Sequence, residues 1–187
     1  MGDVTEIRGA IGTPYNQGSF RTDFRKERGL SGGGVLFDLG IHLIDLSVWL
    51  LGASPTDVAY DCNYAPGWKV ETDACVCLEF PCSTRATIAC SFIRALENAV
   101  TVRGTGGWAR ASLYDPTKLE LFSVPARICQ KDGAQQIILP ARSMYDRQVE
   151  HFCESVLSGS EFLVRPREVK AGISVVEWCY SCRAECA

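Results

Sequence analysis

The stretch SGGGVLFDLGIHLIDLSVWLLG, residues 31–52, constrains the fold of this chain more than any other segment. It predicts the longest and most apolar helix of the chain, which begins near Ser31 or Gly34 and ends at Leu51, because Gly52 and then a proline follow. A helix this apolar must be covered on most of its surface. The remaining sequence must therefore supply a sheet or further helices on which it can pack.

Most of that remaining sequence predicts β-strands, after a loop expected over residues 13–31. Short alternating runs separated by turn-like segments predict strands at residues 3–12, 56–64, 73–80, 84–92, 98–104, 108–115, 118–124 and 135–139. Two closing helices are predicted at 143–159, with Ser143 as N-cap, and at 166–186, begun by Pro166. The sequence thus predicts one α+β domain, a mostly antiparallel open-faced sheet with helices packed on one face.

The second face of this sheet is predicted to be covered as well. On either alternation, seven strand positions are too apolar to be solvated: Ala59, Cys75, Cys77, Ala86, Ile88, Cys90 and Phe92. We expect this face to be an interface, either with further copies of the chain in a homodimer or homotetramer or with a neighbouring domain.

Charge and composition exclude several classes of function. The net charge of -3 and the lack of a dense Lys/Arg patch argue against binding to nucleic acid or to an anionic membrane. No membrane span is expected, because Asp38, His42 and Asp45 interrupt the apolar run at 35–51. The first residues lack the features of a signal peptide, so a cytoplasmic location is expected.

The ten cysteines are interpreted as reduced packing residues. Cys75 and Cys77 alternate along one strand and are poorly placed to bridge each other. Cys179, Cys182 and Cys186 recur with helical spacing and form one stripe. A zinc site at CYSC would need further ligands that the sequence does not supply, so no metal site is predicted.

Ionisable side chains inside the apolar helix are the first sign of chemistry. At 100° per residue, Asp38, His42, Asp45 and Trp49 lie within about 60° of arc. Burying an unpaired ionisable group costs several kcal/mol, so the stripe predicts mutual pairing, exposure to a cleft, or both. Asp38 lies one turn before His42 and is suited to orient the imidazole.

Purely structural interpretations remain beside this one. Asp45 is better explained as a cap or an anchor for a neighbouring loop, and His42 could be a satisfied core histidine. The glycines at 32–34 favour a functional interpretation of Asp38 and His42, because they permit close approach of a ligand to the amides at the start of the helix.

The same stretch resembles the signature of the Gfo/Idh/MocA oxidoreductases, the family of glucose-fructose oxidoreductase and inositol dehydrogenase. The second domain of that family carries a G-G-x-x-x-D-x-G-x-H-x-x-D element, matched here by Gly33, Gly34, Asp38, Gly40, His42 and Asp45. More loosely, residues 2–12 resemble the strand that opens this domain, and the segments 145–159 and 167–183 resemble its closing helices.

The resemblance implies NAD(P)-dependent hydride transfer at a CH–OH group of a sugar, cyclitol or related polyol. It implies that His42 exchanges the proton of the reacting hydroxyl and that Asp38 hydrogen-bonds the substrate. Further candidates for substrate contact are Gly33, Gly34, Asp45 and Tyr145, together with an arginine, Arg21 or Arg25, that would clamp an anionic group.

The family's other half, a dinucleotide-binding domain with a catalytic lysine in a Glu-Lys-Pro element, has no counterpart here. The chain lacks G-x-G-x-x-G spacing and the string EKP. Residues 1–187 are therefore expected to be a single C-terminal domain without the Rossmann domain, inactive alone, and no cofactor-binding residue is assigned. Two alternatives stay open: an oligomerisation module with a degenerate site, and a metal-dependent hydrolase that uses Asp38, His42 and Asp45.

Overall fold

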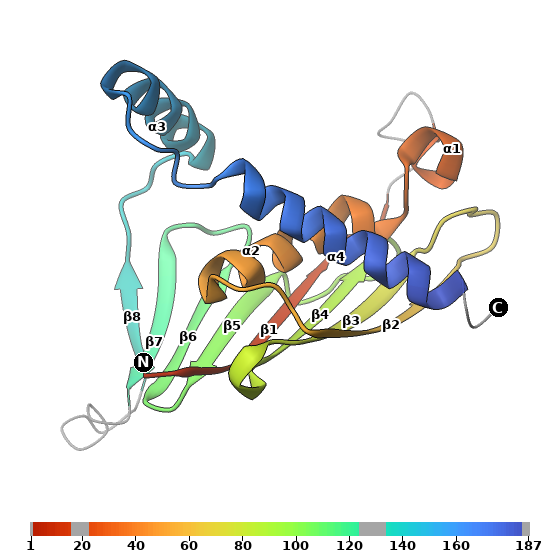
Figure 1. Cartoon of the computed structure of the whole chain (residues 1–187), viewed down its shortest axis with the longest axis horizontal. Coiled ribbons are helices and arrows are strands. Elements are labelled where there is room, and N and C mark those ends of the chain that lie inside the picture. Colours follow the sequence, from red (N-terminus) through yellow and green to blue (C-terminus); the bar gives the residue numbers. More distant parts are fainter. Residues whose placement is uncertain (1, 16–22, 124–133, 185–187) are drawn as a thin grey trace.

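The computed structural model describes residues 2–15, 23–123 and 134–184, and these form one open eight-stranded sheet with helices on one side of it (Figure 1). The strands are β1 (Val4–Gly12), β2 (Asp57–Asn63), β3 (Asp73–Glu79), β4 (Arg85–Ser91), β5 (Ala99–Gly104), β6 (Gly107–Ser112), β7 (Lys118–Ser123) and β8 (Ala134–Ile138). The helices are α1 (Arg28–Ser31), α2 (Ile41–Leu51), α3 (Met144–Ser158) and α4 (Pro166–Ala184), and a π-helical segment, Leu36–Gly40, leads directly into α2. The predicted α+β architecture is confirmed.

The strand order is β2-β3-β4-β1-β5-β6-β7-β8. Strand β1 lies between β4 and β5, parallel to β4 and antiparallel to β5, and the other neighbouring pairs are antiparallel. The parallel pair arises because the chain leaves β1 through the helices before it forms β2, β3 and β4. The first strand thus lies in the middle of the sheet, directly under the helical layer.

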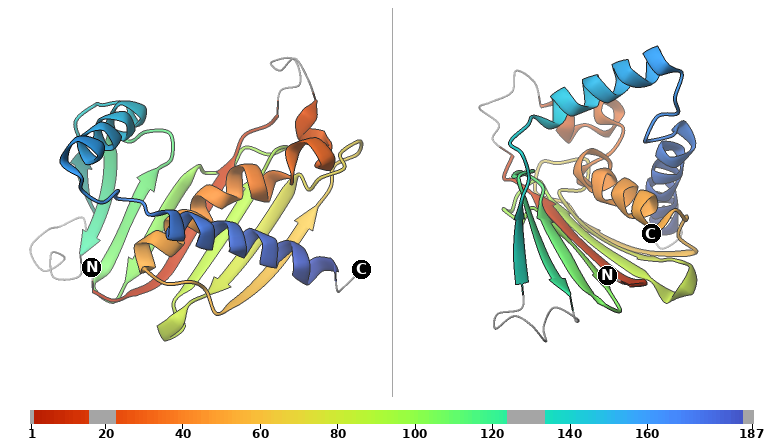
Figure 2. Two further views of the ribbon diagram at one scale, coloured as in Figure 1. Left: turned by 45° about the horizontal axis from the view of Figure 1, so that its top comes forward. Right: turned by 90° about the vertical axis from the view of Figure 1, so that its left-hand side faces the viewer.

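Helices α2 and α4 cover one face of the sheet and pack on each other (Figures 1 and 2). The most deeply buried side chains come from alternate strand positions and from the helical layer, and include Ile7, Leu36, Ile44, Val76, Leu78, Ile88 and Val176. Burial of each such side chain contributes roughly 1.5–3 kcal/mol. At Gly9 in β1 an added Cβ would lie 2.9 Å from Leu43 Cδ1, so α2 crosses β1 at close range.

The helical stretch Arg28–Leu51 is long and apolar enough to span a membrane by length and composition alone, with a hydropathy of 1.7. The prediction that Asp38, His42 and Asp45 would make this stretch too polar for a membrane-spanning composition was wrong. Its apolar character has a reason within the fold, because Leu43, Ile44 and Val48 are buried in the core. A core helix of this kind passes the same composition test.

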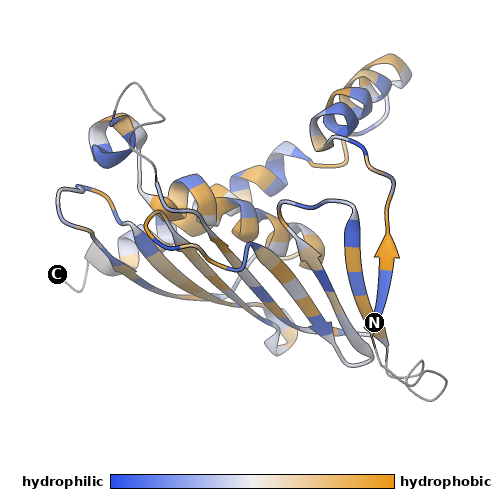
Figure 3. Cartoon of the chain, turned by 180° about the vertical axis from the view of Figure 1, so that it is seen from behind, coloured by the Kyte–Doolittle hydropathy of each residue, from blue (hydrophilic) through white to orange (hydrophobic). Residues whose placement is uncertain are grey.

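The second face of the sheet is more polar than predicted. Ala86, Ile88, Cys90 and Phe92 are buried in the core, so they do not belong to this face. Ala59, Cys75 and Cys77 do lie on it, but so do arginine and glutamate side chains that pair with each other, as in the Arg8–Glu6 and Arg103–Glu6 contacts of 2.7 and 3.4 Å. Figure 3 looks onto this face, which none of the described helices covers.

Helix α3 stands apart from the other helices, beyond the β7–β8 side of the sheet (Figures 1 and 2). Its predicted N-cap is confirmed, since the Ser143 Oγ accepts a hydrogen bond of 3.2 Å from the Tyr145 N–H. Ser155 is its one buried side chain. An exposed apolar stripe runs along the helix, made of Tyr145, Val149, Phe152 and Val156.

Candidate active site

The π-helical segment and α2 form one continuous helical rod, residues 35–51, and Asp38 and His42 lie on its outer side, away from the sheet. Their neighbours Leu36, Gly40 and Leu43 are buried, whereas His42 is exposed and Asp38 is half-buried. An added Cβ at Gly40 would lie 2.8 Å from Leu36 Cδ1 and 3.1 Å from the sulfur of Cys90 in β4. Gly40 therefore lets the helical rod lie close to the sheet, while the side chains of Asp38 and His42 face outward.

The backbone between these two residues is not a regular α-helix. The Ile41 N–H donates to the carbonyl of Leu36, five residues earlier, which makes Leu36–Gly40 a π-helical turn. The prediction of 100° per residue was wrong over this turn, because an i to i+5 bond accommodates an extra residue. Asp38 lies inside the π turn and His42 follows it, and single π turns of this kind are frequent at functional sites.

Asp38 is held by Arg25, which comes from the segment before α1. The Arg25 Nε donates to the Asp38 Oδ2 at 3.1 Å, and the guanidinium lies 5.0 Å from the centre of the Phe24 ring. Both side chains of the ion pair are partly buried. Arg25, predicted to bind an anionic group, thus pairs with Asp38, which was predicted to hydrogen-bond the substrate. His42 lies one turn away and is exposed.

His42 has no hydrogen bond to Asp38 among the described residues, so the expected orienting contact is not made in this structure. The carboxylate of Asp45 interacts with His42 electrostatically and points toward α4, where an added Cβ at Gly172 would lie 3.3 Å from its Oδ1. Burial raises the pKa of Asp45, and the charge of Glu168 raises it further, whereas His42 lowers it. Asp45 therefore contacts a neighbouring helix, not the loop that the sequence suggested.

Gly33 and Gly34 face the protein's own atoms. An added Cβ at Gly33 would lie 2.6 Å from the Tyr180 hydroxyl, and one at Gly34 would lie 2.3 Å from the carbonyl oxygen of Glu71. Packing alone thus explains why glycine is needed at both positions. Substrate contact at these glycines stays a prediction.

The structure does not bring Tyr145 to the other candidates. Tyr145 lies on α3 and is 71% exposed, and Figures 1 and 2 place α3 apart from α2. Arg21, the other arginine proposed as a clamp, falls outside the described residues.

Sequence reasoning missed Glu71 and Tyr180, which both contact the start of the helical rod. Glu71 lies two residues before β3 and Tyr180 lies far along α4, and neither position has a pattern of its own. No signal in the sequence could have found them, because the burial of Glu71 becomes visible only in the folded chain.

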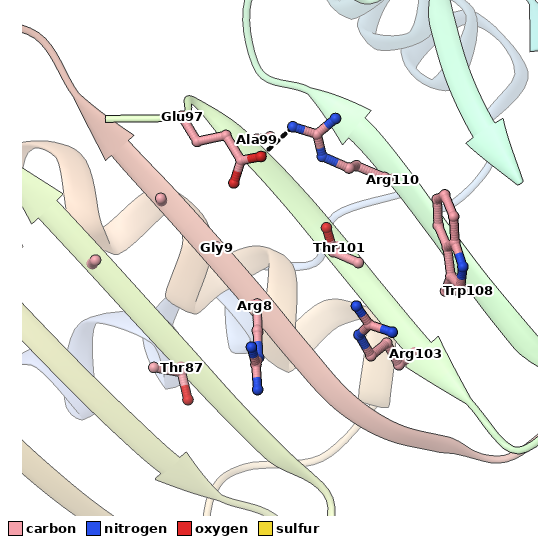
Figure 4. A pocket seen from close by; sticks show the side chains of 11 residues that line it. Arg8, Gly9, Thr87, Glu97, Ala99, Thr101, Arg103, Trp108 and Arg110 are labelled. Atoms are coloured by element: carbon pink, nitrogen blue, oxygen red, sulfur yellow. Dashed lines mark hydrogen bonds and ion pairs between the residues drawn. The ribbon is translucent and has the colours of Figure 1, made fainter. Parts of the chain in front are cut away.

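A broad depression lies on the opposite face of the sheet (Figure 4). It has a volume of about 460 Å³, and its lining includes Ala10, Ala89, Ala99, Arg8, Arg103, Trp108 and Arg110. Arg110 pairs with Glu97 and Glu120, so its charge is compensated. The sheet separates this depression from Asp38 and His42, and it therefore belongs to a different surface.

The metal-hydrolase alternative gains no support from the structure. Within residues 2–15, 23–123 and 134–184, no three His, Cys, Asp or Glu side chains are grouped so that they could hold a metal ion.

Burial raises the pKa of the Cys179 thiol to about 12, so this thiol is protonated and packs as a small apolar group. Cys186 of the predicted stripe falls outside the described residues.

Comparison with known families gives a clear assignment. The family described as GFO/IDH/MocA C-terminal domain matches residues 1–110, which is more than half of the 187-residue chain. The chain belongs to this family. The match includes Asp38, His42 and Glu71, and ends before α3 and α4.

Solved structures share the fold of this GFO/IDH/MocA domain. Aldose-aldose oxidoreductase from Caulobacter crescentus, complexed with glycerol, superposes with a TM-score of 0.83 at 21% identity, over 100% of this chain and 55% of that one. An NAD-binding oxidoreductase from Klebsiella pneumoniae gives 0.81 at 15% identity, over 98% and 58% of the two chains. GenD2 of gentamicin A biosynthesis, in complex with NAD, gives 0.75 at 23% identity, over 100% and 55%.

These GFO/IDH/MocA relatives are considerably longer than the present chain, which spans between half and three fifths of their length. No curated protein matches the sequence significantly. At these identities the likeness establishes the fold of the whole described chain, including α3 and α4, which lie beyond the family match.

Proposed function

We propose that this chain is the substrate-binding domain of an NAD(P)-dependent oxidoreductase that acts on a CH–OH group of a sugar, cyclitol or related polyol. The observation that carries the proposal is the exposed His42 beside the Arg25–Asp38 pair, on a helix supported by the sheet. These residues lie within the family match. The glycerol complex of the Caulobacter relative supports a polyol as the class of substrate.

His42 would exchange the proton in this reaction. In the oxidation direction, the imidazole accepts the hydroxyl proton while the carbinol carbon loses a hydride and becomes a carbonyl carbon. Histidine is a common general acid and base in enzymes, and its exposure gives the His42 side chain access to a substrate and to water. Asp38, kept in place by Arg25, would accept a hydrogen bond from a second substrate hydroxyl.

The nicotinamide cofactor, NAD or NADP, would take up or deliver the hydride. The residues of this chain do not fit a dinucleotide site. The sequence lacks G-x-G-x-x-G, and in the described sheet β1 and β4 are the one parallel pair, so no βαβ unit of the dinucleotide-binding kind is formed. We therefore place the cofactor on a separate Rossmann domain, consistent with the greater length of the NAD-bound relative.

The proton-transfer role is tested by substitution in the full-length enzyme. His42→Ala should lower turnover by roughly a hundredfold or more, since general acid–base groups contribute on that scale. Asp38→Ala should lower it by roughly a hundredfold as well, because the substrate loses a hydrogen bond that orients it. His151→Ala is the matched control, because His151 lies on α3 and accepts a hydrogen bond from the Leu163 N–H. Steady-state kinetics with unchanged rates for His42→Ala would remove the catalytic assignment.

The domain assignment has its own test, on the 187-residue chain alone. It should bind NAD(H) weakly or not at all and show no turnover, because the proposed dinucleotide site lies elsewhere. Isothermal titration calorimetry with NADH and an assay for nicotinamide reduction measure both properties. Robust dehydrogenase activity from this chain by itself would overturn the assignment.

A further inference from the structure

Three successive backbone amides at the start of the helical rod are all bound by two residues from distant parts of the chain. The Gly34 N–H donates to the Tyr180 hydroxyl at 3.3 Å. The Val35 N–H donates to the Glu71 carbonyl at 3.0 Å, and the Leu36 N–H donates to the Glu71 Oε1 at 3.2 Å. The first amides of a helix have no partners within the helix, so Glu71 and Tyr180 cap it from outside.

Glu71 is unusually buried for a glutamate, with 3% of its surface exposed. Besides the Leu36 amide, its Oε1 accepts a hydrogen bond of 2.8 Å from the Tyr180 hydroxyl. A buried carboxylate is costly unless such donors surround it, and the positive end of a helix adds to its stabilisation. Glu71 therefore acts as a buried cap, whose side chain and carbonyl accept hydrogen bonds from the first amides of the helix.

Tyr180 completes the cluster from α4. Its hydroxyl donates to Glu71 and accepts from Gly34, which uses both functions of a phenol. Burial and the adjacent Glu71 carboxylate raise the pKa of Tyr180 well above its ordinary value, so the donor proton is retained. The Arg28 guanidinium lies 5.6 Å from the centre of the ring.

This cluster is connected directly to the candidate active site. The Gly34 carbonyl accepts the Asp38 N–H at 3.0 Å, and the π turn that contains Asp38 begins at Leu36, whose amide is bound by Glu71. His42 lies two residues after the end of the π turn at Gly40. A shift at the clamped amides would therefore move both side chains relative to the sheet.

We propose that Glu71 and Tyr180 are positioning residues, which clamp the start of the rod and thereby set the places of Asp38 and His42. The proposal deepens the proposed function and rests on it, since positioning matters to catalysis only if these side chains react with substrate. Neither residue is assigned a contact with substrate. Displacement of a reactive group by about 1 Å can cost roughly a hundredfold in rate.

The first experiment measures the position of His42 without relying on activity. The chain has two histidines, so the ring C–H resonances of His42 and His151 are resolved readily by NMR. In the 187-residue chain, Glu71→Ala and Tyr180→Phe should shift the His42 resonances by more than their linewidth and leave those of His151 unchanged. Unchanged His42 resonances in folded Glu71→Ala or Tyr180→Phe protein would overturn the proposal.

The matched control is Thr84→Val. Thr84 is a buried polar residue at another site, and its hydroxyl donates to the Val4 carbonyl at 2.7 Å. The variant loses a hydroxyl that donates a hydrogen bond, as Tyr180→Phe does, although the Tyr180 hydroxyl also accepts one, and it should leave the His42 resonances in place. A shift of His42 in Thr84→Val would mean that general destabilisation, not the clamp, moves the histidine, and this too would overturn the proposal.

The second experiment measures kcat and KM in the full-length enzyme. Glu71→Ala should lower kcat by roughly ten- to a hundredfold, whereas Glu71→Gln, which keeps an oxygen for the Leu36 amide and the Tyr180 hydroxyl, should restore most of it. Equal losses in the two variants would contradict the clamp. The two hypotheses fail differently: unchanged turnover in His42→Ala refutes the catalytic role, while the NMR result on His42 decides the positioning role alone.

Discussion

Asp45 shows how one side chain couples the helix that bears His42 to the last helix of the chain. Its Oδ1 is buried, has no hydrogen-bond partner among the described residues, and lies against Gly172 of α4. Burial is the main reason that its pKa is raised, with a smaller contribution from Glu168. The folded protein therefore binds the Asp45 proton more tightly than the unfolded chain does.

This difference makes stability depend on pH. The stabilisation from the raised pKa is fully present below the unfolded value, 3.8, and is lost as pH rises through the higher folded value. Asp45→Asn cannot ionise, so it should unfold at a higher urea concentration than the natural protein at about pH 7, with a smaller gain near pH 4. Asp61→Asn, at an exposed site in β2, is the control. An equal gain at both pH values would contradict burial as the cause.

At the scale of elements, the start of the helical rod is closely packed against other parts of the described chain. Gly34 leaves no room for a side chain, because Glu71 occupies the space. Gly29, in α1, has nothing within 4 Å of an added Cβ. Both glycines have ordinary backbone angles, so the two sites differ mainly in packing.

The difference between these glycines predicts opposite effects of one substitution. Gly34→Ala should destabilise the protein by about 1–3 kcal/mol, the usual cost of overpacking, and Gly29→Ala should be neutral or stabilise it by a few tenths of a kcal/mol. Urea denaturation of both variants measures this. If Gly34→Ala is as stable as Gly29→Ala, the Glu71 contact is looser than the structure indicates.

At the scale of the whole molecule, the open face of the sheet remains to be explained. It combines paired charges with a shallow depression lined by small residues, among them Ala10, Ala89 and Ala99. Arginines and glutamates are interspersed on it, as in the Arg110–Glu120 pair, so two copies could exchange ion pairs across it. We propose that this face mediates self-association into a homodimer or homotetramer.

Size-exclusion chromatography with light scattering tests this proposal. The chain should elute as an oligomer, and Ala10→Glu, which places a charge in the depression, should shift it toward the monomer. Gln135→Glu adds the same charge on the helix side of β8, as its register with Leu121 indicates, and should leave the oligomer intact. A strict monomer at high concentration would contradict the proposal.

Much of the fold could be predicted from local patterns, because local physics determines them. Strand ranges such as 73–80 and 84–92 agree with β3 and β4, since alternation of side chains directly reflects a sheet with one buried face. Ser143 caps α3 as expected. The parallel pairing of β1 with β4 and the short helix α1 within the expected loop were missed, because neither leaves a local pattern.

The candidate site was predicted in its residue types but only partly in its geometry. Asp38 and His42 face outward as their polarity required, and Arg25 pairs with Asp38, a contact that the sequence did not predict. The regular helical spacing failed at Leu36–Gly40, where the π turn intervenes. Tyr145 is not near the others, because the position of α3 depends on contacts that its own sequence does not encode.

The sequence by itself determined what local interactions control: the strands and their alternation, the cap at Ser143, the end of α2 at Gly52, and the presence of an aspartate and a histidine on an apolar helix. Only the tertiary structure decided how that helix is held. Glu71 and Tyr180 are far apart in the chain and meet because the segment before β3 and helix α4 both contact residues at the start of the helix. Hydrogen bonds between such distant residues depend on the assembled core, so no pattern along the chain reveals them.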